Sequence, residues 1–429
     1  MNRRQVLRGA ALAGAGAIGG AGRAWAEDSL WGSGSGQTWS NARILTGLMP
    51  GDWPVELAGG IHVQDGTIVA IGPEVTGGID LGGATIWPGM WETGTSMGIA
   101  EIDLEPATRD DVESGDPLEP QVRVVDAFNP QSALQPVLRA RGVMGALVMP
   151  GGGVVSGQAA WMRTSGNTVS EATVLAPAGL VINLGKAGVS AGGATSRMGV
   201  AARLRDVLEA NPPPQDPPKP SMWKRAPPPA TPPKPPTRAE AVWHDLLSWR
   251  LKAIFVADRA SDIELALGLA SDYGLDAVIV GAAEGWMLAD ELSDAGVPVV
   301  LGPVTAQPDS FDHLRARYDN AALLHAAGVR LAIRIGDPHR TFDLSTEAGI
   351  AVAWGLPYSV AVAAITGNSP DFFGLTQGRL VTGREATFVI SDGDPLEPRT
   401  SVKHVVVNGV EMPLVNHQTE LYDRFRVLK

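Results

Sequence analysis

Short apolar runs alternate with helix-like stretches through the middle of the chain, between about residues 85 and 367. The apolar runs cover residues 146–149, 180–183, 253–256, 277–280, 297–301 and 331–335. Between two of them, residues 261–270 place Ile263, Leu267 and Ala270 on one face of a helix. Because the alternation continues over so long a stretch, it predicts an α/β fold whose parallel strands close into a (β/α)8 TIM-like barrel. An open doubly wound sheet would give the same pattern.

Strand-like segments also occur at both ends of the chain. Residues 42–46 and 61–72 alternate apolar and polar side chains around a turn, and residues 383–393 and 402–407 resemble them, with Asn408-Gly409 as a tight turn. These segments predict a small β-sandwich domain built from both ends of the chain. We expect its N-terminal part at residues 40–84, the barrel at residues 85–376 and its C-terminal part at residues 377–415.

The first 26 residues have the layout of a secretory signal. Arg3 and Arg4 precede an Ala/Gly-rich stretch over residues 9–22, and Ala24-Trp25-Ala26 supplies a small-x-small cleavage site. The alternative, a retained membrane anchor, is less favoured because the stretch is shorter than the ~20 residues that a bilayer-spanning helix needs. The pattern predicts a twin-arginine signal peptide at residues 1–26 and a soluble periplasmic protein after cleavage, with no membrane insertion.

Charge and cysteine content restrict the partners and the chemistry. Removal of the signal with its four arginines leaves 30 basic and 46 acidic residues, a formal net charge of −16. Nucleic acids and anionic membranes need a basic face, so neither is an expected partner. The chain has no cysteine, which excludes disulfides, thiolate metal ligands and a cysteine nucleophile.

A proline-rich segment at residues 211–237 interrupts the barrel pattern. Proline fixes φ and removes a backbone donor, so this segment is expected to be extended, largely as polyproline II. It is interpreted as a tolerated surface insertion. The alternative is a docking site for a proline-binding partner, for which Trp223 is the relevant residue.

Ordered motifs near both ends resemble the amidohydrolase superfamily, in particular imidazolonepropionase-like metal-dependent hydrolases. The motifs are residues 65–72, residues 79–83, Trp87-Pro88-Gly89-Met90, residues 364–375 and residues 405–409. The resemblance covers nearly the whole chain after the signal, apart from the proline-rich insertion. It implies a hydrolase of non-peptide carbon–nitrogen bonds. Typical members hold a divalent metal at the C-terminal mouth of the barrel, where the metal activates water.

The residues at the metal-ligand positions of this family are unusual. The resemblance places Gly94 and Ser96 where a first-strand His-x-His motif belongs, Val256 at the fifth-strand position and Gly281 at the sixth. Only Asp337, at the eighth strand, matches. None of the other four can replace an imidazole, and one carboxylate does not make a transition-metal site. We therefore predict an eroded metal site and no metal cofactor, with Asp337 as the candidate catalytic residue.

Other residues could compensate for the missing ligands. His339 lies two positions after Asp337, and several carboxylates could gather oxygen ligands around a hard cation. These carboxylates are Glu92, Glu101, Asp103, Asp258 and Glu284. Acidic loop residues are more often simply solvated. Lys186 follows an expected strand and could bind an anionic ligand, although a surface lysine is the more common case.

Three functional hypotheses remain. The first is an active periplasmic hydrolase of non-peptide carbon–nitrogen bonds with an atypical site around Asp337. The second is a catalytically inactive protein, a possible pseudoenzyme, that binds a small molecule or acts as a scaffold through the barrel mouth. The third is a non-catalytic subunit that associates with an active relative, and a homo-oligomer is also possible. The sequence assigns no substrate-binding residue.

Overall fold

The structure is a computed structural model, and it describes residues 36–48, 55–190, 194–212, 235–305 and 310–427. The signal peptide predicted at residues 1–26 and Trp223, with most of the proline-rich segment, lie outside the described residues. Within the described ranges, no helix is both long enough and apolar enough to cross a membrane.

The middle of the chain forms an eight-stranded, nearly closed barrel sheet. Its strands are β6 (Met90–Thr95), β7 (Val143–Val148), β8 (Val155–Arg163), β9 (Thr173–Asn183), β10 (Lys252–Ala257), β11 (Ala277–Gly281), β12 (Val299–Leu301) and β13 (Leu331–Ile333). They pair in this order, and β9 to β13 are all parallel. The predicted α/β class and the strand-like runs of this region are therefore present.

The regular (β/α)8 repeat is not confirmed. Strand β8 is antiparallel to both β7 and β9, so no crossover helix separates these three strands. The cause is the glycine-rich turn before β8, where Gly152 and Gly153 have φ values of +77° and +67° and reverse the chain. Gly157 and Gln158 lie within β8.

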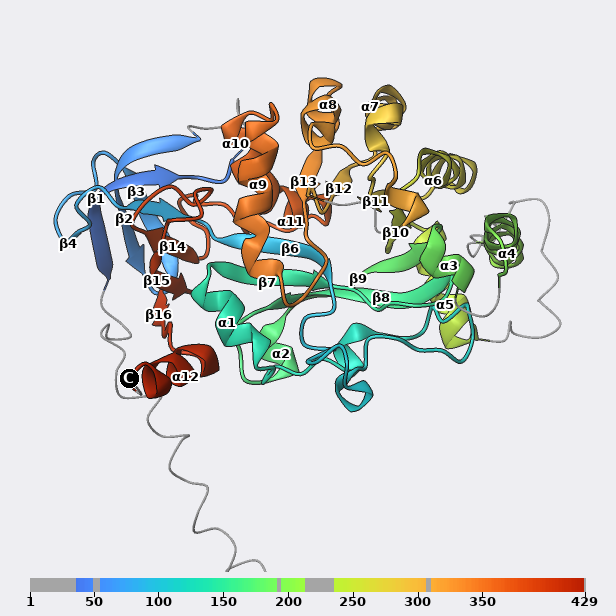
Figure 1. The fold of residues 1–429 in the computed structure, drawn as a ribbon, viewed down its shortest axis with the longest axis horizontal. Helices are drawn as coiled ribbons and strands as arrows, with labels where there is room; N and C mark the ends of the chain where they lie inside the picture. Colours follow the sequence, from blue (N-terminus) through green and yellow to red (C-terminus); the bar gives the residue numbers. More distant parts are fainter. Residues whose placement is uncertain (1–35, 49–54, 191–193, 213–234, 306–309, 428–429) are drawn as a thin grey trace, which may run out of the picture.

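Helices cover the outside of the barrel sheet, and α6, α7 and α8 lie along one side of it (Figure 1). The helices of the barrel region are α1 (Leu134–Ala140), α2 (Val169–Ala172), α3 (Lys186–Ser190), α4 (Arg197–Ala210), α5 (Arg238–Leu247), α6 (Ala260–Tyr273), α7 (Ala289–Ala295), α8 (Asn320–Ala326), α9 (Leu344–Ala353), α10 (Tyr358–Ile365) and α11 (Asn368–Phe372). Helix α6 matches the expected helix and buries Ile263 and Leu269 against the sheet. It ends where Gly274 takes a left-handed conformation.

Side chains, and not strand pairing, join the first and last strands of the barrel sheet in the described part of the chain. The buried carboxylate of Glu92, on β6, accepts hydrogen bonds from the backbone of Ile335 and Gly336, which follow β13. Helix α11 adds a second link, because Asn368 donates to the carbonyl of Leu331 in β13 over 2.8 Å and Ser369 hydrogen-bonds to Thr93 in β6. These contacts bring the C-terminal end of β13 next to β6.

Both ends of the chain contribute to a second sheet. Its strands are β1 (Gln37–Leu45), β2 (Glu56–Gln64), β3 (Thr67–Gly72), β4 (Ile79–Asp80), β5 (Thr85–Trp87), β14 (Phe388–Ser391), β15 (Val402–Val407) and β16 (Val410–Met412). Ile68 of β3 exchanges backbone hydrogen bonds with residues 383 and 384, so the sheet curls around a small core that contains Ile44 and Phe388. The expected two-sheet sandwich is not confirmed, because the strands form one hydrogen-bonded sheet.

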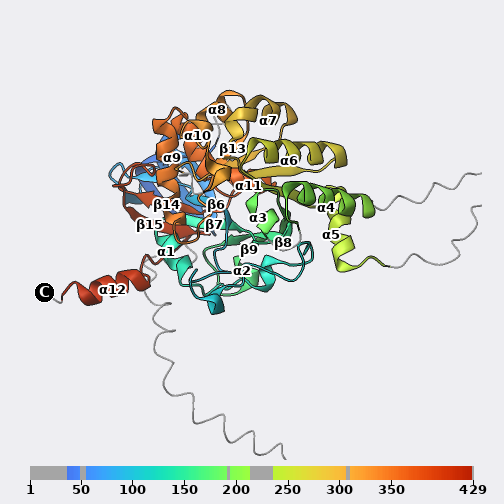
Figure 2. The ribbon, with the colours of Figure 1, turned by 45° about the vertical axis from the view of Figure 1, so that its right-hand side comes forward.

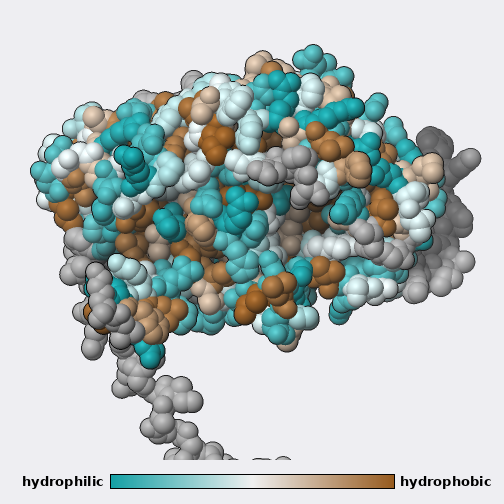
Figure 3. Space-filling model, in the orientation of Figure 1, coloured by the Kyte–Doolittle hydropathy of each residue, from teal (hydrophilic) through white to brown (hydrophobic). Residues whose placement is uncertain are grey.

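A C-terminal helix, α12 (His417–Phe425), was not predicted from the sequence. It projects away from the rest of the molecule (Figure 2), and its side chains are not buried. Asn416 caps its first turn through the backbone amides of Gln418 and Thr419. On the face drawn in Figure 3, exposed apolar residues are scattered among polar ones and form no single large patch.

Candidate functional site

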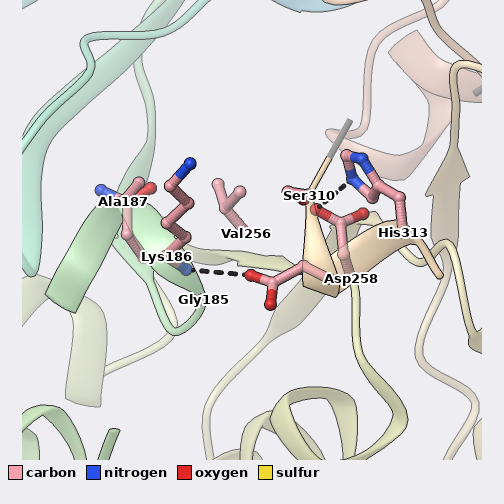
Figure 4. Close-up of a pocket in the computed structure, with 9 residues that line it drawn as sticks. Gly185, Lys186, Ala187, Val256, Asp258, Ser310 and His313 are labelled. Atoms are coloured by element: carbon pink, nitrogen blue, oxygen red, sulfur yellow. Dashed lines mark hydrogen bonds and ion pairs between the residues drawn. The ribbon is translucent and has the colours of Figure 1, made fainter. Parts of the chain in front are cut away.

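The candidate site is a pocket of about 370 Å³ at the C-terminal ends of the parallel strands (Figure 4). It is lined by Asn183, Gly185, Lys186, Ala187, Val256, Asp258, Ser310, Asp312 and His313. These residues come from the end of β9, the beginning of α3, the end of β10, and the short helix η4 (Phe311–His313) that follows β12. Barrel sheets position ligands at this end because the variable loops follow the strands there.

Charged and polar groups face each other across this pocket. Lys186 and Ala187 lie on one side, whereas Asp258, Ser310 and His313 lie on the other (Figure 4). The Nε2 atom of His313 is 3.3 Å from Oδ2 of Asp258. A carboxylate beside an imidazole orients the ring and fixes its tautomer, which is an arrangement suited to proton transfer.

A partly buried ion-pair network adjoins the pocket through Asp312. Arg197, the first residue of α4, contacts Asp262 at 2.9 Å and Asp312 at 2.7 Å. Burial disfavours the charge of Arg197, but its hydrogen bonds to the two carboxylates hold its pKa above the usual value. Asp312 also accepts a hydrogen bond from the backbone amide of Lys186. The network therefore fixes the start of α3 against η4.

The residues at the family's metal-ligand positions do not fit a transition metal. Gly94 lies in β6, Val256 lines the pocket from β10, and Gly281 ends β11. None of them carries a ligand atom, and Ser96, just after β6, offers only a hydroxyl. In the described ranges, no group of three or more His, Asp or Glu side chains is arranged to hold a metal ion.

Charged side chains occupy the space next to two of these glycines. A Cβ atom built on Gly94 would lie 3.1 Å from Cζ of Arg334, and one built on Gly281 would lie 2.4 Å from Oδ1 of Asp258. A larger residue at either position would push against a charged group. Both glycines also have positive φ values, of +82° and +107°.

Asp337 does not line the pocket. Its Oδ1 accepts a hydrogen bond from the backbone amide of His339 over 2.8 Å, so the carboxylate stabilises a local turn. The His339 side chain points toward Asp103 instead, with 3.9 Å between Nε2 and Oδ1. The structure therefore does not bring Asp337 and the His339 ring together with Asp258.

The remaining predicted carboxylates have separate roles. Glu284 is buried and accepts a hydrogen bond from the amide of Ala260, at the beginning of α6. Glu101 lies 3.4 Å from the side-chain amide of Asn129. Of the acidic residues considered from the sequence, only Asp258 lines the pocket.

Arg334 and its relation to Glu92 were missed by the sequence analysis. Arg334 directly follows β13, and its Nη2 donates to the carbonyl oxygen of Gly94 over 2.7 Å. Burial raises the pKa of Glu92 to about 7, although Arg334 and three backbone amides counteract this effect. The sequence offers one signal for Arg334, which is its position directly after a fully apolar strand. Charged residues are common at strand ends, so this signal does not single it out.

Comparison with known proteins identifies the fold. No profile of a known protein family matches the chain, and no curated protein is similar to it in sequence. Among solved structures, an amidohydrolase from Thermotoga maritima superposes with a TM-score of 0.77 at 23% identity, over 88% of this chain and 99% of that one. The chain therefore shares the fold of this amidohydrolase, in agreement with the resemblance of its terminal motifs.

Two more distant structures share this fold. A triazine hydrolase from Arthobacter aurescens gives a TM-score of 0.53 at 15% identity, over 92% of this chain and 99% of that one. A molinate hydrolase gives a TM-score of 0.51 at 15% identity, over 90% and 96% of the two chains. At such identities the likeness concerns the fold, so the activity has to be argued from the site.

Proposed function

We propose that this chain belongs to the amidohydrolase superfamily and binds a small polar molecule at its barrel mouth without the metal of typical members. The observation that carries the proposal is the pocket between Lys186 and the Asp258–His313 pair. The pocket has the size of a small-molecule site and presents groups of both charge signs. The ligand that fits this chemistry carries an anionic group and a hydrogen-bond donor.

A second candidate function is metal-free hydrolysis of non-peptide carbon–nitrogen bonds. The specific observation in its favour is the contact between His313 and Asp258 in the pocket. His313 would take a proton from water as the water oxygen attacks a substrate carbonyl carbon. It would return that proton to the leaving nitrogen as the carbon–nitrogen bond breaks, and Asp258 would stabilise the imidazolium. An amidohydrolase and a triazine hydrolase share this fold, and both names are consistent with this class of reaction.

One set of measurements separates the two functions. N-acyl amino acids and cyclic imides are tested for thermal stabilisation of the protein and for hydrolysis, with product detection by mass spectrometry. Metal content is measured on the same preparation, purified without chelator or metal-affinity resin. Stabilisation without product supports the binding function, turnover by metal-free protein supports the second, and a stoichiometric zinc that is needed for turnover overturns both.

Two substitutions locate the site. We expect Asp258→Asn to remove stabilisation or turnover, because it removes the charge next to His313. Asp337→Asn tests the sequence-based hypothesis that Asp337 is the catalytic residue. It is expected to leave ligand stabilisation and turnover unchanged, since Asp337 does not line the pocket. Loss in Asp337→Asn with full function in Asp258→Asn would return the site to Asp337.

The mature protein is proposed to be exported to the periplasm and to associate with a second copy or an active relative. The twin-arginine motif at Arg3-Arg4 supports a periplasmic location after cleavage of residues 1–26. N-terminal sequencing of the secreted protein, and of an Arg3→Lys/Arg4→Lys variant that should stay in the cytoplasm, tests this location. Light scattering and affinity capture test for a homo-oligomer or an active relative as partner.

A further inference from the structure

We infer that Arg334 is a built-in cation that balances the carboxylates Glu92 and Asp258 and fills the space beside the first barrel strand where a metal would otherwise sit. Its guanidinium donates to the Gly94 carbonyl, and a Cβ on Gly94 would meet both Cζ of Arg334 and Sδ of Met149 at 3.1 Å. The side chain therefore occupies the volume that a larger residue at position 94 would need.

The local backbone is shaped around this guanidinium. A Cβ atom on Gly336 would lie 1.9 Å from Nη2 of Arg334, so only glycine fits there while Arg334 keeps its position. Gly336 and Gly94 both have a φ of +82°. Two glycines, from opposite edges of the barrel sheet, thus form a cradle for one arginine.

The charges around Arg334 are consistent with this role. Glu92 is fully buried and accepts hydrogen bonds from the amides of Ile335 and Gly336 at 3.0 and 2.9 Å. Burial lowers the pKa of Arg334, whereas the charges of Glu92 and Asp258 counteract that effect. A buried carboxylate that carries its charge needs a nearby positive charge, and guanidinium remains protonated even when partly desolvated.

The position of Arg334 links the two ends of the barrel sheet. Arg334 follows β13 and bonds to β6, and Glu92 of β6 bonds back to the residues after β13. No strand pairing joins β6 and β13 over the residues that the structure covers. The arginine and the glutamate therefore close the barrel at its mouth, next to the pocket that Asp258 lines.

Chemical rescue tests this inference on the full mature chain. At a pH above 7, where Glu92 is charged, Arg334→Ala is expected to lower the unfolding temperature by roughly 5 °C or more, because it leaves this carboxylate without its cation. Guanidinium chloride at low millimolar concentration should restore part of the loss, whereas urea, a neutral molecule of the same shape, should not. Equal effects of guanidinium and urea, or no loss in Arg334→Ala, would overturn the inference.

A double-mutant cycle keeps the test informative if Arg334→Ala does not fold. Arg334→Met keeps most of the side-chain volume and removes the charge. Arg334→Met/Glu92→Gln is expected to unfold at a higher temperature than Arg334→Met alone, because the double variant has no uncompensated charge at Glu92. If the double variant is less stable than Arg334→Met, Arg334 does not act by balancing Glu92.

The inference on Arg334 rests on the proposed function in one respect, namely that no metal occupies the barrel mouth. A zinc titration distinguishes the failure of one from the failure of the other. Zinc that stabilises Arg334→Ala but not the wild type supports both. Zinc that stabilises the wild type at this site overturns both. If guanidinium rescues Arg334→Ala but no tested ligand binds the wild-type pocket, the proposed function fails and the inference on Arg334 stands.

Discussion

Arg163, the last residue of β8, and Glu385, just before β14, face each other in a two-pronged ion pair with nitrogen–oxygen distances of 2.6 and 2.7 Å. The pair connects the barrel sheet to the sheet that both chain ends form. Its side chains are only 15% and 27% exposed, so solvent screens it less than a surface pair. We expect Arg163→Met to lower the free energy of unfolding by about 2 kcal/mol, measured by urea denaturation.

Arg426→Met is the matched control for that substitution. Arg426, which follows α12 directly, contacts Asp423 at 3.1 Å, but both side chains are more than half exposed. Removal of such a surface pair is expected to change the free energy of unfolding by less than about 0.5 kcal/mol. Similar losses for Arg163→Met and Arg426→Met would show that the link between the two sheets adds no special stability.

The stability of the protein should respond to pH through Glu92. Burial raises the pKa of Glu92 from 4.5 to about 7, so folding favours its protonated form. This contribution is complete below pH 4.5 and is lost as the pH rises through about 7. We expect Glu92→Gln to remove a pH-dependent fall of at most about 3 kcal/mol in this window. Chemical denaturation at several pH values measures it, and an unchanged pH profile would contradict it.

Glu385 gives the opposite pH dependence. Burial alone would raise its pKa, but the hydrogen bonds from Arg163 and Thr387 outweigh burial and lower the pKa below 4.5. Its stabilising contribution is therefore present above that ordinary value and is lost as the pH falls through the lowered one. Glu385→Gln should flatten the acidic limb of the stability profile, whereas Glu92→Gln should flatten the limb between pH 4.5 and 7.

Much of the fold was predictable because its determinants are local in sequence. The apolar run at residues 253–256 became β10 (Lys252–Ala257), and the periodic segment after it became α6. Strand β8 was not predicted because its glycines suggest turns. Gly157 nevertheless lies within the strand, and a Cβ atom on it would be 2.7 Å from the carbonyl oxygen of Val122. Glycine is needed at this position because the backbone of a separate segment packs closely against the strand, and the local sequence does not reveal that contact.

The candidate site was less predictable, since its contacts join residues far apart in the chain. Arg334 donates a hydrogen bond to Gly94 and interacts with the charge of Glu92, and His313 contacts Asp258. The partners in each pair are far apart in the sequence. Asp337 was favoured because it matched a family position, but its carboxylate bonds within its own turn. A motif indicates which residue types stand at the family positions, and only packing shows which side chains lie beside them.

The network below the pocket should depend on Arg197. Replacement by methionine removes the cation that the buried carboxylates of Asp262 and Asp312 share. We expect Arg197→Met to lower the free energy of unfolding by about 3 kcal/mol and to weaken binding at the pocket, because Asp312 also holds the amide of Lys186. Arg203→Met, exposed on the same helix, is the control and should have little effect. Equal stability of the two variants in urea would contradict the proposed network.

Gly281→Ala tests whether the space beside β11 is needed for Asp258. Position 281 has a φ of +107°, and a Cβ there would lie 2.4 Å from Oδ1 of Asp258. Alanine at position 281 is expected to destabilise the fold by about 1–3 kcal/mol through backbone strain. It is also expected to displace the Asp258 carboxylate from His313. Gly355→Ala isolates the strain, because Gly355 has a φ of +105° and its Cβ would meet only Ala322, at 3.6 Å.

The two variants should therefore lose similar stability from strain, but only Gly281→Ala should also lose ligand binding at the pocket. Calorimetry with the N-acyl amino acid or cyclic imide that stabilises the wild type most provides the measurement. Retained binding in Gly281→Ala would mean that Asp258 does not need its position beside His313. Lost binding in both variants would point to a general effect of strain, because Gly355 lies outside the pocket lining. Loss in Gly281→Ala alone would show that the space at this glycine keeps the Asp258 carboxylate in the position that binding requires.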